Sequence, residues 1–168
     1  MKTNFEKAFE HLISIEGGYV FDPADRGGET KFGITKRNYP NLDIEKIDLE
    51  DARTIYFNHY WNTRRMNLDD FEYEVAYELF DTGVNASMGT ARRMLQRALN
   101  LLNRVETLFD DLRVDGWIGS ETLKAVKKVN KTRLLKVLNG LQFMHYYNIV
   151  ESDHSQERFF AGWIGKRT

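Results

Sequence analysis

A glutamate lies on the apolar face of the first predicted helix, at its last turn. Glu16 follows the apolar stripe of that helix at helical spacing, because the eleven residues from Phe5 to Glu16 make about three turns. The stripe consists of Phe5, Ala8, Phe9, Leu12 and Ile13. Partial desolvation and the negative end of the helix macrodipole both favour the protonated form of this carboxyl group. A protonated carboxyl group can donate its proton to the leaving oxygen of a glycosidic bond, so Glu16 is a candidate general acid. The alternative is that the side chain of Glu16 extends to solvent and has no catalytic role.

The segment after this glutamate is rich in acidic, glycine and hydroxyl residues. It runs Glu16-Gly17-Gly18-Tyr19, then Asp22-Pro23-Ala24-Asp25-Arg26-Gly27-Gly28-Glu29-Thr30, then Gly33-Ile34-Thr35. Asp25 and Asp22 compete as the second acidic group of a site. Asp22 before Pro23 also suits an Asx turn, and Asp25 also suits a turn or an ion pair with Arg26. The two glycine-rich phosphate-binding patterns, G-x-x-x-x-G-K-[ST] and G-x-G-x-x-G, are both absent from this segment.

This segment resembles the N-terminal signature of the glycoside hydrolase 108 family of peptidoglycan-cleaving lysozymes. That signature contains E-G-G-Y, D-P-x-D-P-G-G-x-T and G-I-T, and Arg26 stands where the family more often has a second proline. The similarity continues through the aromatic pair Tyr60-Trp61 and the segment 81–86. The later half is similar to the helical peptidoglycan-binding region that accompanies this hydrolase, at Leu95-Gln96, Asp115-Gly116-Trp117-Ile118-Gly119 and Arg158-Phe159-Phe160-Ala161-Gly162-Trp163.

The resemblance implies a lysozyme, an N-acetylmuramidase that cleaves the β-1,4 bond between N-acetylmuramic acid and N-acetylglucosamine and so lyses the bacterial cell wall. Glu16 is then the general acid. Asp25 resembles the aspartate of phage-type lysozymes in its spacing from the acid, and Thr30 resembles the threonine that holds the attacking water. A water on the opposite sugar face implies inversion, whereas a closely placed carboxylate implies a covalent route. The alternatives are a lytic transglycosylase with anhydro-muramyl products and a non-catalytic wall-binding or secretion-assisting protein.

Seven residues are candidates for contact with the saccharide: Tyr19, Phe32, Tyr60, Trp61, Asp81, Asn85 and Trp117. The aromatic rings can stack on sugar faces or pack in the core. The aspartate and asparagine, four residues apart at a helix end, can bond sugar acetamido or hydroxyl groups or cap the next turn. The four histidines show no metal-ligand spacing, so we expect no metal and no cofactor.

Composition indicates a soluble globular protein. The chain has 168 residues, 42% of them hydrophobic, and no cysteine, which excludes a disulfide scaffold and thiol catalysis. Residues 1–82 carry 10 Lys and Arg against 17 Asp and Glu, and residues 83–168 carry 14 against 8. The basic half lacks the interleaved aromatic residues of a nucleic-acid-binding module. We therefore expect its lysines, Lys124, Lys127, Lys128 and Lys131, to attract the anionic cell wall.

Periodicity predicts a mostly α, α+β lysozyme-like fold: a helical-bundle lobe with a small β-hairpin and the catalytic glutamate at the end of the first helix. Helices are expected over 3–16, 48–60, 70–82, 90–103, 120–129, 132–149 and 156–164, with a hairpin or ordered loop between 19 and 34. Thr3 with Glu6 forms a predicted capping box, and Asp48 and Ser120 are predicted caps. Residues 1–82 would form the catalytic lobe and 83–168 the peptidoglycan-binding lobe, packed as one unit.

The expected setting follows from the missing targeting signals. No apolar stretch approaches the roughly 18 residues that span a membrane, and no secretory signal is visible at the N-terminus. We expect synthesis in the bacterial host cytoplasm and action on the wall in the periplasm after release through a holin-type pore. A phage endolysin fits best, with a bacterial export-associated lysozyme second. The expected partner is the peptidoglycan glycan strand, bound by a monomer without stable membrane insertion.

Overall fold

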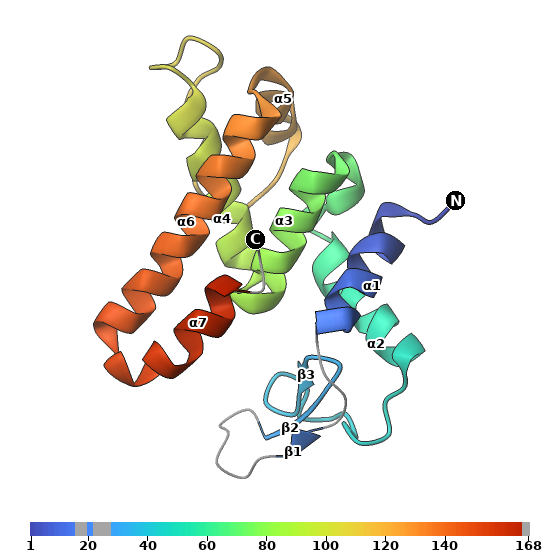
Figure 1. Ribbon diagram of the computed structural model, residues 1–168. Helices are drawn as coiled ribbons and strands as arrows, with labels where there is room; N and C mark the ends of the chain where they lie inside the picture. Colours follow the sequence, from blue (N-terminus) through green and yellow to red (C-terminus); the bar gives the residue numbers. More distant parts are fainter. Residues whose placement is uncertain (16–19, 22–27, 166–168) are drawn as a thin grey trace. The chain divides into compact units, whose positions relative to one another are not determined.

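The computed structural model describes residues 1–15, 20–21 and 28–165 (Figure 1). Its backbone contacts divide the chain into two compact units, Met1–Thr63 and Arg64–Thr168. The lobe boundary predicted at residues 82 and 83 falls inside a helix of the second unit. The described part is mostly helical, as predicted.

Helix α1, Asn4–Ile15, opens the first unit. The predicted capping box is confirmed: the Thr3 N–H donates to Glu6 Oε2 at 2.8 Å, and the Glu6 N–H donates to Thr3 Oγ1 at 3.2 Å. The predicted apolar stripe is buried at four of its five positions, Phe5, Ala8, Phe9 and Leu12. Because two reciprocal bonds satisfy the free N–H groups of the first turn, the start of this helix is set by local sequence alone.

A three-stranded antiparallel sheet follows in the described residues, in the order β1-β2-β3. Its strands are β1 (Val20–Phe21), β2 (Glu29–Lys31) and β3 (Ile34–Thr35). Val20 pairs with Thr30, and Thr30 pairs with Thr35. The expected hairpin is therefore present and is extended by a third strand.

Helix α2, Leu49–Tyr56, continues into a π-helical turn, Phe57–Trp61, and the short strand β4, Asn62–Thr63. The predicted cap is confirmed, since the Asp48 carboxylate accepts from the N–H groups of Glu50 and Asp51. The first unit is held by aromatic rings: Phe5 lies 5.0 Å from Phe57 and 5.5 Å from Trp61 between ring centroids. Single π-helical turns often mark functional sites in proteins.

The second unit is a helical bundle. Its elements are β5 (Met66–Asn67), the 3-10 turn η2 (Leu68–Asp70), α3 (Tyr73–Asn85), α4 (Met88–Leu102), α5 (Ser120–Lys128), α6 (Lys131–Ser152), η3 (His154–Gln156) and α7 (Glu157–Gly165). Helices α3, α4 and α6 pack together, and α7 folds back beside α6 (Figure 1). Fully buried leucines of the three central helices, Leu79, Leu95, Leu99 and Leu134, form its core.

One predicted cap is wrong. Ser120 is the first residue of α5, and the N-cap position belongs to Gly119, which offers no side-chain acceptor. The Ser120 hydroxyl instead lies 3.5 Å from Glu121 Oε1. Glycine is tolerated at an N-cap, so the helix begins one residue earlier than its most favourable capping side chain suggests.

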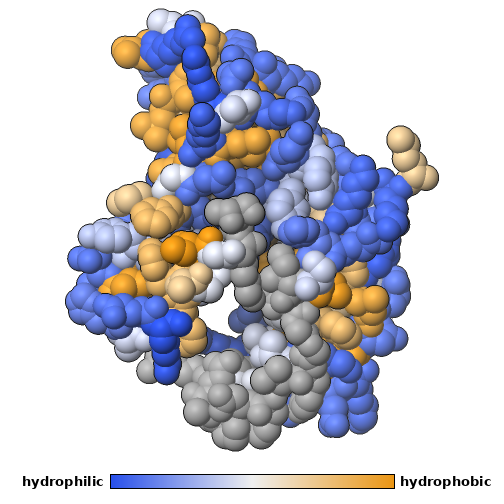
Figure 2. All heavy atoms as spheres, viewed as in Figure 1, coloured by the Kyte–Doolittle hydropathy of each residue, from blue (hydrophilic) through white to orange (hydrophobic). Residues whose placement is uncertain are grey.

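On the face shown in Figure 2, the coloured residues are mostly hydrophilic, with hydrophobic residues reaching the surface in places. The large exposed apolar side chains of α6 and α7 are Phe143, Met144, Tyr147, Phe159 and Ile164. Within the residues that the structure describes, no helix has both the length and the hydropathy needed to cross a bilayer.

Candidate functional site

The predicted acid and its companions fall largely outside the described residues. Glu16, Tyr19 and Asp25 lie in the segments 16–19 and 22–27, as does the competing Asp22. Their roles therefore remain predictions. The structure describes the elements on either side: α1 ends at Ile15, and β1 and β2 pair antiparallel, so the chain between them connects two neighbouring strands.

Thr30 lies in the middle strand of this small sheet. It is half-buried and has Val20 on one side and Thr35 on the other as Cα partners. The middle strand of three is held on both edges, so the position of Thr30 relative to β1 and β3 is set by backbone pairing. This placement suits a residue that must present a hydroxyl group in a constant position.

Phe32 occupies a tight turn between β2 and β3. Phe32 and Gly33 have φ angles of +54° and +76°, as in the two-residue turns that match the twist of antiparallel strands. A positive φ is unfavourable for phenylalanine, and the turn is held from outside. The hydroxyl group of Tyr56 on α2 donates to the Phe32 carbonyl at 3.0 Å. The helix and the sheet that carries Thr30 are thereby connected by a hydrogen bond between side chain and backbone.

Tyr60 lines a surface cavity of about 700 Å³ in the first unit. Tyr39 and His59 line the same cavity; their rings stack with centroids 5.6 Å apart, and the Tyr39 hydroxyl lies 2.9 Å from His59 Nδ1. Burial, together with the neighbouring Tyr60, raises the pKa of Tyr39, so its hydroxyl stays protonated and able to donate a hydrogen bond. Neither Tyr39 nor His59 was a candidate site residue from the sequence, because twenty residues separate the two and only the fold brings them together.

Trp61 does not offer a ring face to a sugar. Its side chain is fully buried, packed against Phe5 of α1. The indole is therefore a core residue of the first unit, which is the structural reading that the sequence left open for each aromatic candidate.

Asp81 and Asn85 form a polar network inside the second unit. The Asn85 amide donates to the Asp81 carbonyl at 2.8 Å and to Asp81 Oδ1 at 3.1 Å. Gln142 of α6 donates to Asp81 Oδ2 at 3.3 Å and to Thr82 Oγ1 at 3.0 Å. Asp81 is only 9% exposed. Ser87 caps the following helix, so the capping role that the sequence left open for this pair is not seen. Asp81 connects α3 to α6 through Gln142, Asn85 is exposed, and contact of the pair with a sugar stays a prediction.

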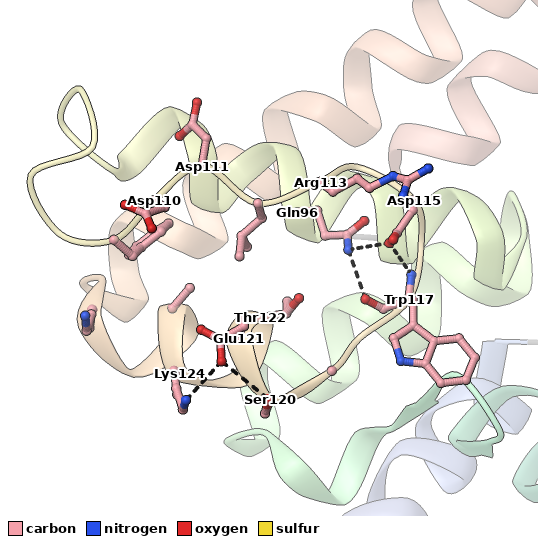
Figure 3. A pocket seen from close by; sticks show the side chains of 15 residues that line it. Gln96, Asp110, Asp111, Arg113, Asp115, Trp117, Ser120, Glu121, Thr122 and Lys124 are labelled. Atoms are coloured by element: carbon pink, nitrogen blue, oxygen red, sulfur yellow. Dashed lines mark hydrogen bonds and ion pairs between the residues drawn. The ribbon is translucent and has the colours of Figure 1, made fainter.

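Trp117 lies at a pocket of about 470 Å³ bounded by α4, the loop 109–119 and α5 (Figure 3). Its indole is 49% exposed, unlike that of Trp61. Its backbone is fixed on both sides: the Trp117 N–H donates to Asp115 Oδ1 at 2.8 Å, and the Trp117 carbonyl accepts from Gln96 Nε2 at 3.0 Å. Of the predicted saccharide contacts in the second unit, Trp117 is the aromatic one, and it is about half exposed, with Arg65 lying over its ring.

Comparison with known proteins shows what each part of the chain is similar to. Residues 9–87 match the model of the glycosyl hydrolase 108 family, which covers a little under half of the chain. Residues 90–168 match the model of a predicted peptidoglycan domain. Among solved structures, SagA of Brucella abortus is 28% identical, with a TM-score of 0.75 over 96% of this chain and 88% of SagA. A search of curated proteins found no match.

The glycosyl hydrolase 108 match and the peptidoglycan domain together support a peptidoglycan hydrolase. The mostly α, lysozyme-like fold predicted from the sequence is confirmed. The glycosyl hydrolase 108 segment contains the whole motif from Glu16 to Ile34, whereas Trp117 and its pocket lie in the peptidoglycan domain. The described residues contain no group of three or more His, Asp or Glu side chains arranged to hold a metal ion.

Three of the four lysines predicted to attract the wall, Lys124, Lys128 and Lys131, already have partners. Lys131 contacts Glu72 at 2.6 Å and Glu74 at 3.2 Å, and Lys124 contacts Glu121 at 2.9 Å. The Lys128 ammonium group donates to the Leu108 carbonyl at 2.8 Å. These contacts reduce the positive charge that this cluster can offer to the wall.

Proposed function

We propose that this protein is a muramidase that hydrolyses the β-1,4 bond between N-acetylmuramic acid and N-acetylglucosamine. Glu16 protonates the glycosidic oxygen as the bond from C1 of the muramic acid to that oxygen breaks. Asp25 takes a proton from the attacking water, Thr30 positions that water, and the new C1–OH bond completes hydrolysis.

The glycosyl hydrolase 108 match carries this proposal, because it covers the segment in which all three residues lie. The arrangement of the described elements agrees with it. Thr30 lies on the central strand of the small sheet, and the helix preceding Glu16 is anchored through Phe5 and Phe9 to the aromatic core. A general acid and a water-positioning group require such anchoring, because small displacements reduce the rate steeply.

The test is the Glu16→Gln variant, which keeps the size of the side chain and removes its acid. We expect it to fold as the wild type does and to lose nearly all clearing of purified cell-wall suspensions. Asp25→Asn should also lose most activity, whereas the matched Asp22→Asn should keep it. Wild-type clearing by Glu16→Gln would refute the assignment of Glu16 as the acid. If Asp22→Asn loses activity and Asp25→Asn retains it, the water-activating role belongs to Asp22 instead of Asp25.

Product chemistry separates hydrolysis from its nearest rival. A hydrolase adds water, so mass spectrometry of digested peptidoglycan should show reducing muramic acid ends. Anhydro-muramyl ends would instead identify a lytic transglycosylase. The anomeric configuration of the first product, followed by NMR, distinguishes inversion by a water-activating Asp25 from a covalent route.

The proposed setting is wall lysis by a phage endolysin that is made in the bacterial host cytoplasm and reaches the wall through a holin-type pore. Expression of the chain with and without a holin in a bacterial host tests this setting. Lysis only with the holin is expected, and lysis without it would contradict dependence on the pore.

A further inference from the structure

Three arginines gather around the turn that carries Trp117. A Cβ atom placed on Gly116 would lie 3.8 Å from Arg93 Cζ and 3.9 Å from Arg92 Nε, so both side chains of α4 lie against this turn. Arg65 lies over the Trp117 ring, with Cζ 6.0 Å from the ring centre. The Arg65 carbonyl accepts from the Ile118 N–H at 3.1 Å, which fixes the two segments together.

The positive charges of this arginine cluster (Arg65, Arg92 and Arg93) are not balanced within the described chain. None of the three forms an ion pair with a described carboxylate, and the buried Arg92 Nε has no hydrogen-bond partner. Burial and the nearby charges of Arg65 and Arg93 lower the pKa of Arg92. Like charges held together with an unpaired buried donor cost free energy, and a bound anion would offset this cost.

The carboxylate of Asp115, in the same turn, does not fill this role. The Asp115 carboxylate accepts from the Trp117 N–H and from the Gln96 amide, and its neighbouring cation is Arg113 rather than a member of the cluster. Asp115 therefore fixes the position of the turn and leaves the guanidinium groups available for a ligand.

The exposed indole adds a second kind of contact. Trp117 combines a half-exposed ring with a backbone held by Gln96, so it offers a rigid apolar face beside the guanidinium groups. Guanidinium groups bind carboxylates through paired N–H donors, and an indole face suits the C–H face of a sugar ring. The ligand that matches both is a saccharide with a carboxylate attached close by.

We propose that the arginine cluster and Trp117 bind the peptide-bearing unit of peptidoglycan, with the stem-peptide carboxylate on the arginines and the attached sugar on the indole. The stem peptide is the source of the carboxylate because the lactyl carboxyl group of muramic acid is amide-bonded to it. This inference rests on the proposed substrate, and it gives the peptidoglycan domain a peptide-reading role distinct from the bond that Glu16 cleaves.

The test is isothermal titration calorimetry of the full chain carrying Glu16→Gln, so that binding affinity is measured without cleavage of the ligand. The ligand is a disaccharide–tetrapeptide muropeptide with free carboxylates, and its control is the same compound with the carboxylates amidated. We expect the amidated ligand, and separately Arg65→Gln or Arg92→Gln, to weaken binding by about tenfold or more, since one charged hydrogen bond contributes about 1.5–3 kcal/mol. Arg97→Gln, an exposed arginine of α4 outside the cluster, should bind as the parent does.

Each other outcome is decisive. Equal affinity for the amidated ligand, or unchanged binding by the exposed-side-chain variant Arg65→Gln, would overturn the proposal even if Arg92→Gln folds poorly. Displacement of the muropeptide by an equal concentration of inorganic phosphate would also overturn it, because the cluster would then be a general anion site. If Glu16→Gln still cleaves the ligand, product will be found in the calorimeter cell after the titration. That result would count against Glu16 as the acid and would leave the binding proposal to be judged by the arginine variants.

Discussion

The side-chain amide of Gln96 donates to the carboxylate of Asp115 at 3.1 Å, and these two residues organise the turn that presents Trp117 (Figure 3). Gln96 Oε1 also accepts from the buried Gly116 N–H at 2.8 Å. The glutamine is only 2% exposed, although it lies on a helix whose polar residues otherwise face solvent or the loop. One buried amide therefore fixes a loop that has no regular secondary structure.

Gln96→Leu is expected to lower the free energy of unfolding by about 2–4 kcal/mol, because it leaves buried backbone groups of residues 116 and 117 without partners. Urea unfolding followed by circular dichroism measures this change. Arg97→Leu, next in sequence and exposed, is the matched control and should change stability by less than about 0.5 kcal/mol. Equal stability of the two variants would contradict the role given to Gln96.

The stability of the second unit should depend on Asp115 at acidic pH. The Trp117 N–H, then the Gln96 amide, lower the pKa of Asp115 below its ordinary value of 3.8. A group whose pKa is lower in the folded state stabilises the fold above its unfolded-state pKa, and this contribution is lost as the pH falls through the folded-state pKa. Between about pH 4 and pH 2, Asp115→Asn should therefore lose less stability than the wild type. Parallel curves of unfolding midpoint against pH would contradict this.

Tyr56→Phe should loosen the turn that follows Thr30. The substitution removes the hydroxyl group that donates to the Phe32 carbonyl, at a cost of about 1 kcal/mol, and keeps the ring packing against Phe9. Thermal unfolding gives the loss of stability, and wall clearing should fall as well if the sheet positions Thr30 for catalysis. Tyr147→Phe, an exposed tyrosine of α6, is the control and should leave both measurements unchanged.

The close packing of Met88 against Gly83 predicts that position 83 does not tolerate a larger side chain. A Cβ atom on Gly83 would overlap Met88 Sδ, so Gly83→Val should destabilise the chain by about 1–3 kcal/mol through overpacking. Met88→Ala removes the overlapping side chain. The double variant should therefore be more stable than the sum of the two single changes, a coupling that denaturant unfolding of all four proteins measures.

Local structure in this chain was predictable where a few neighbouring residues decide it. The capping box of Thr3 and Glu6 and the cap at Asp48 are confirmed because every atom involved lies within three residues. The cap predicted at Ser120 is wrong by one residue, because Gly119 is accepted at the N-cap without any side-chain bond. Propensity ranks such neighbours, but the geometry of the preceding loop selects between them.

Long-range partners were not predictable. The Lys131 ammonium group reaches Glu72, and the Gln142 amide reaches Asp81, across about sixty residues of sequence. The role of Gln96 was equally hidden, since a glutamine on an amphipathic helix carries no sign of the loop that it will hold. Only packing of α3, α4 and α6 brings these groups within hydrogen-bond distance.

The sequence by itself predicted the resemblance to glycosyl hydrolase 108 and the candidate acid, because the motif from Glu16 to Thr35 is contiguous and its chemistry can be read from residue types and spacing. Tertiary structure decided which aromatic side chains can meet a ligand. Trp61 and Trp117 look alike in sequence, yet one is fully buried and the other is half-exposed beside three arginines. Exposure depends on what other parts of the chain cover, and a local pattern does not contain that information.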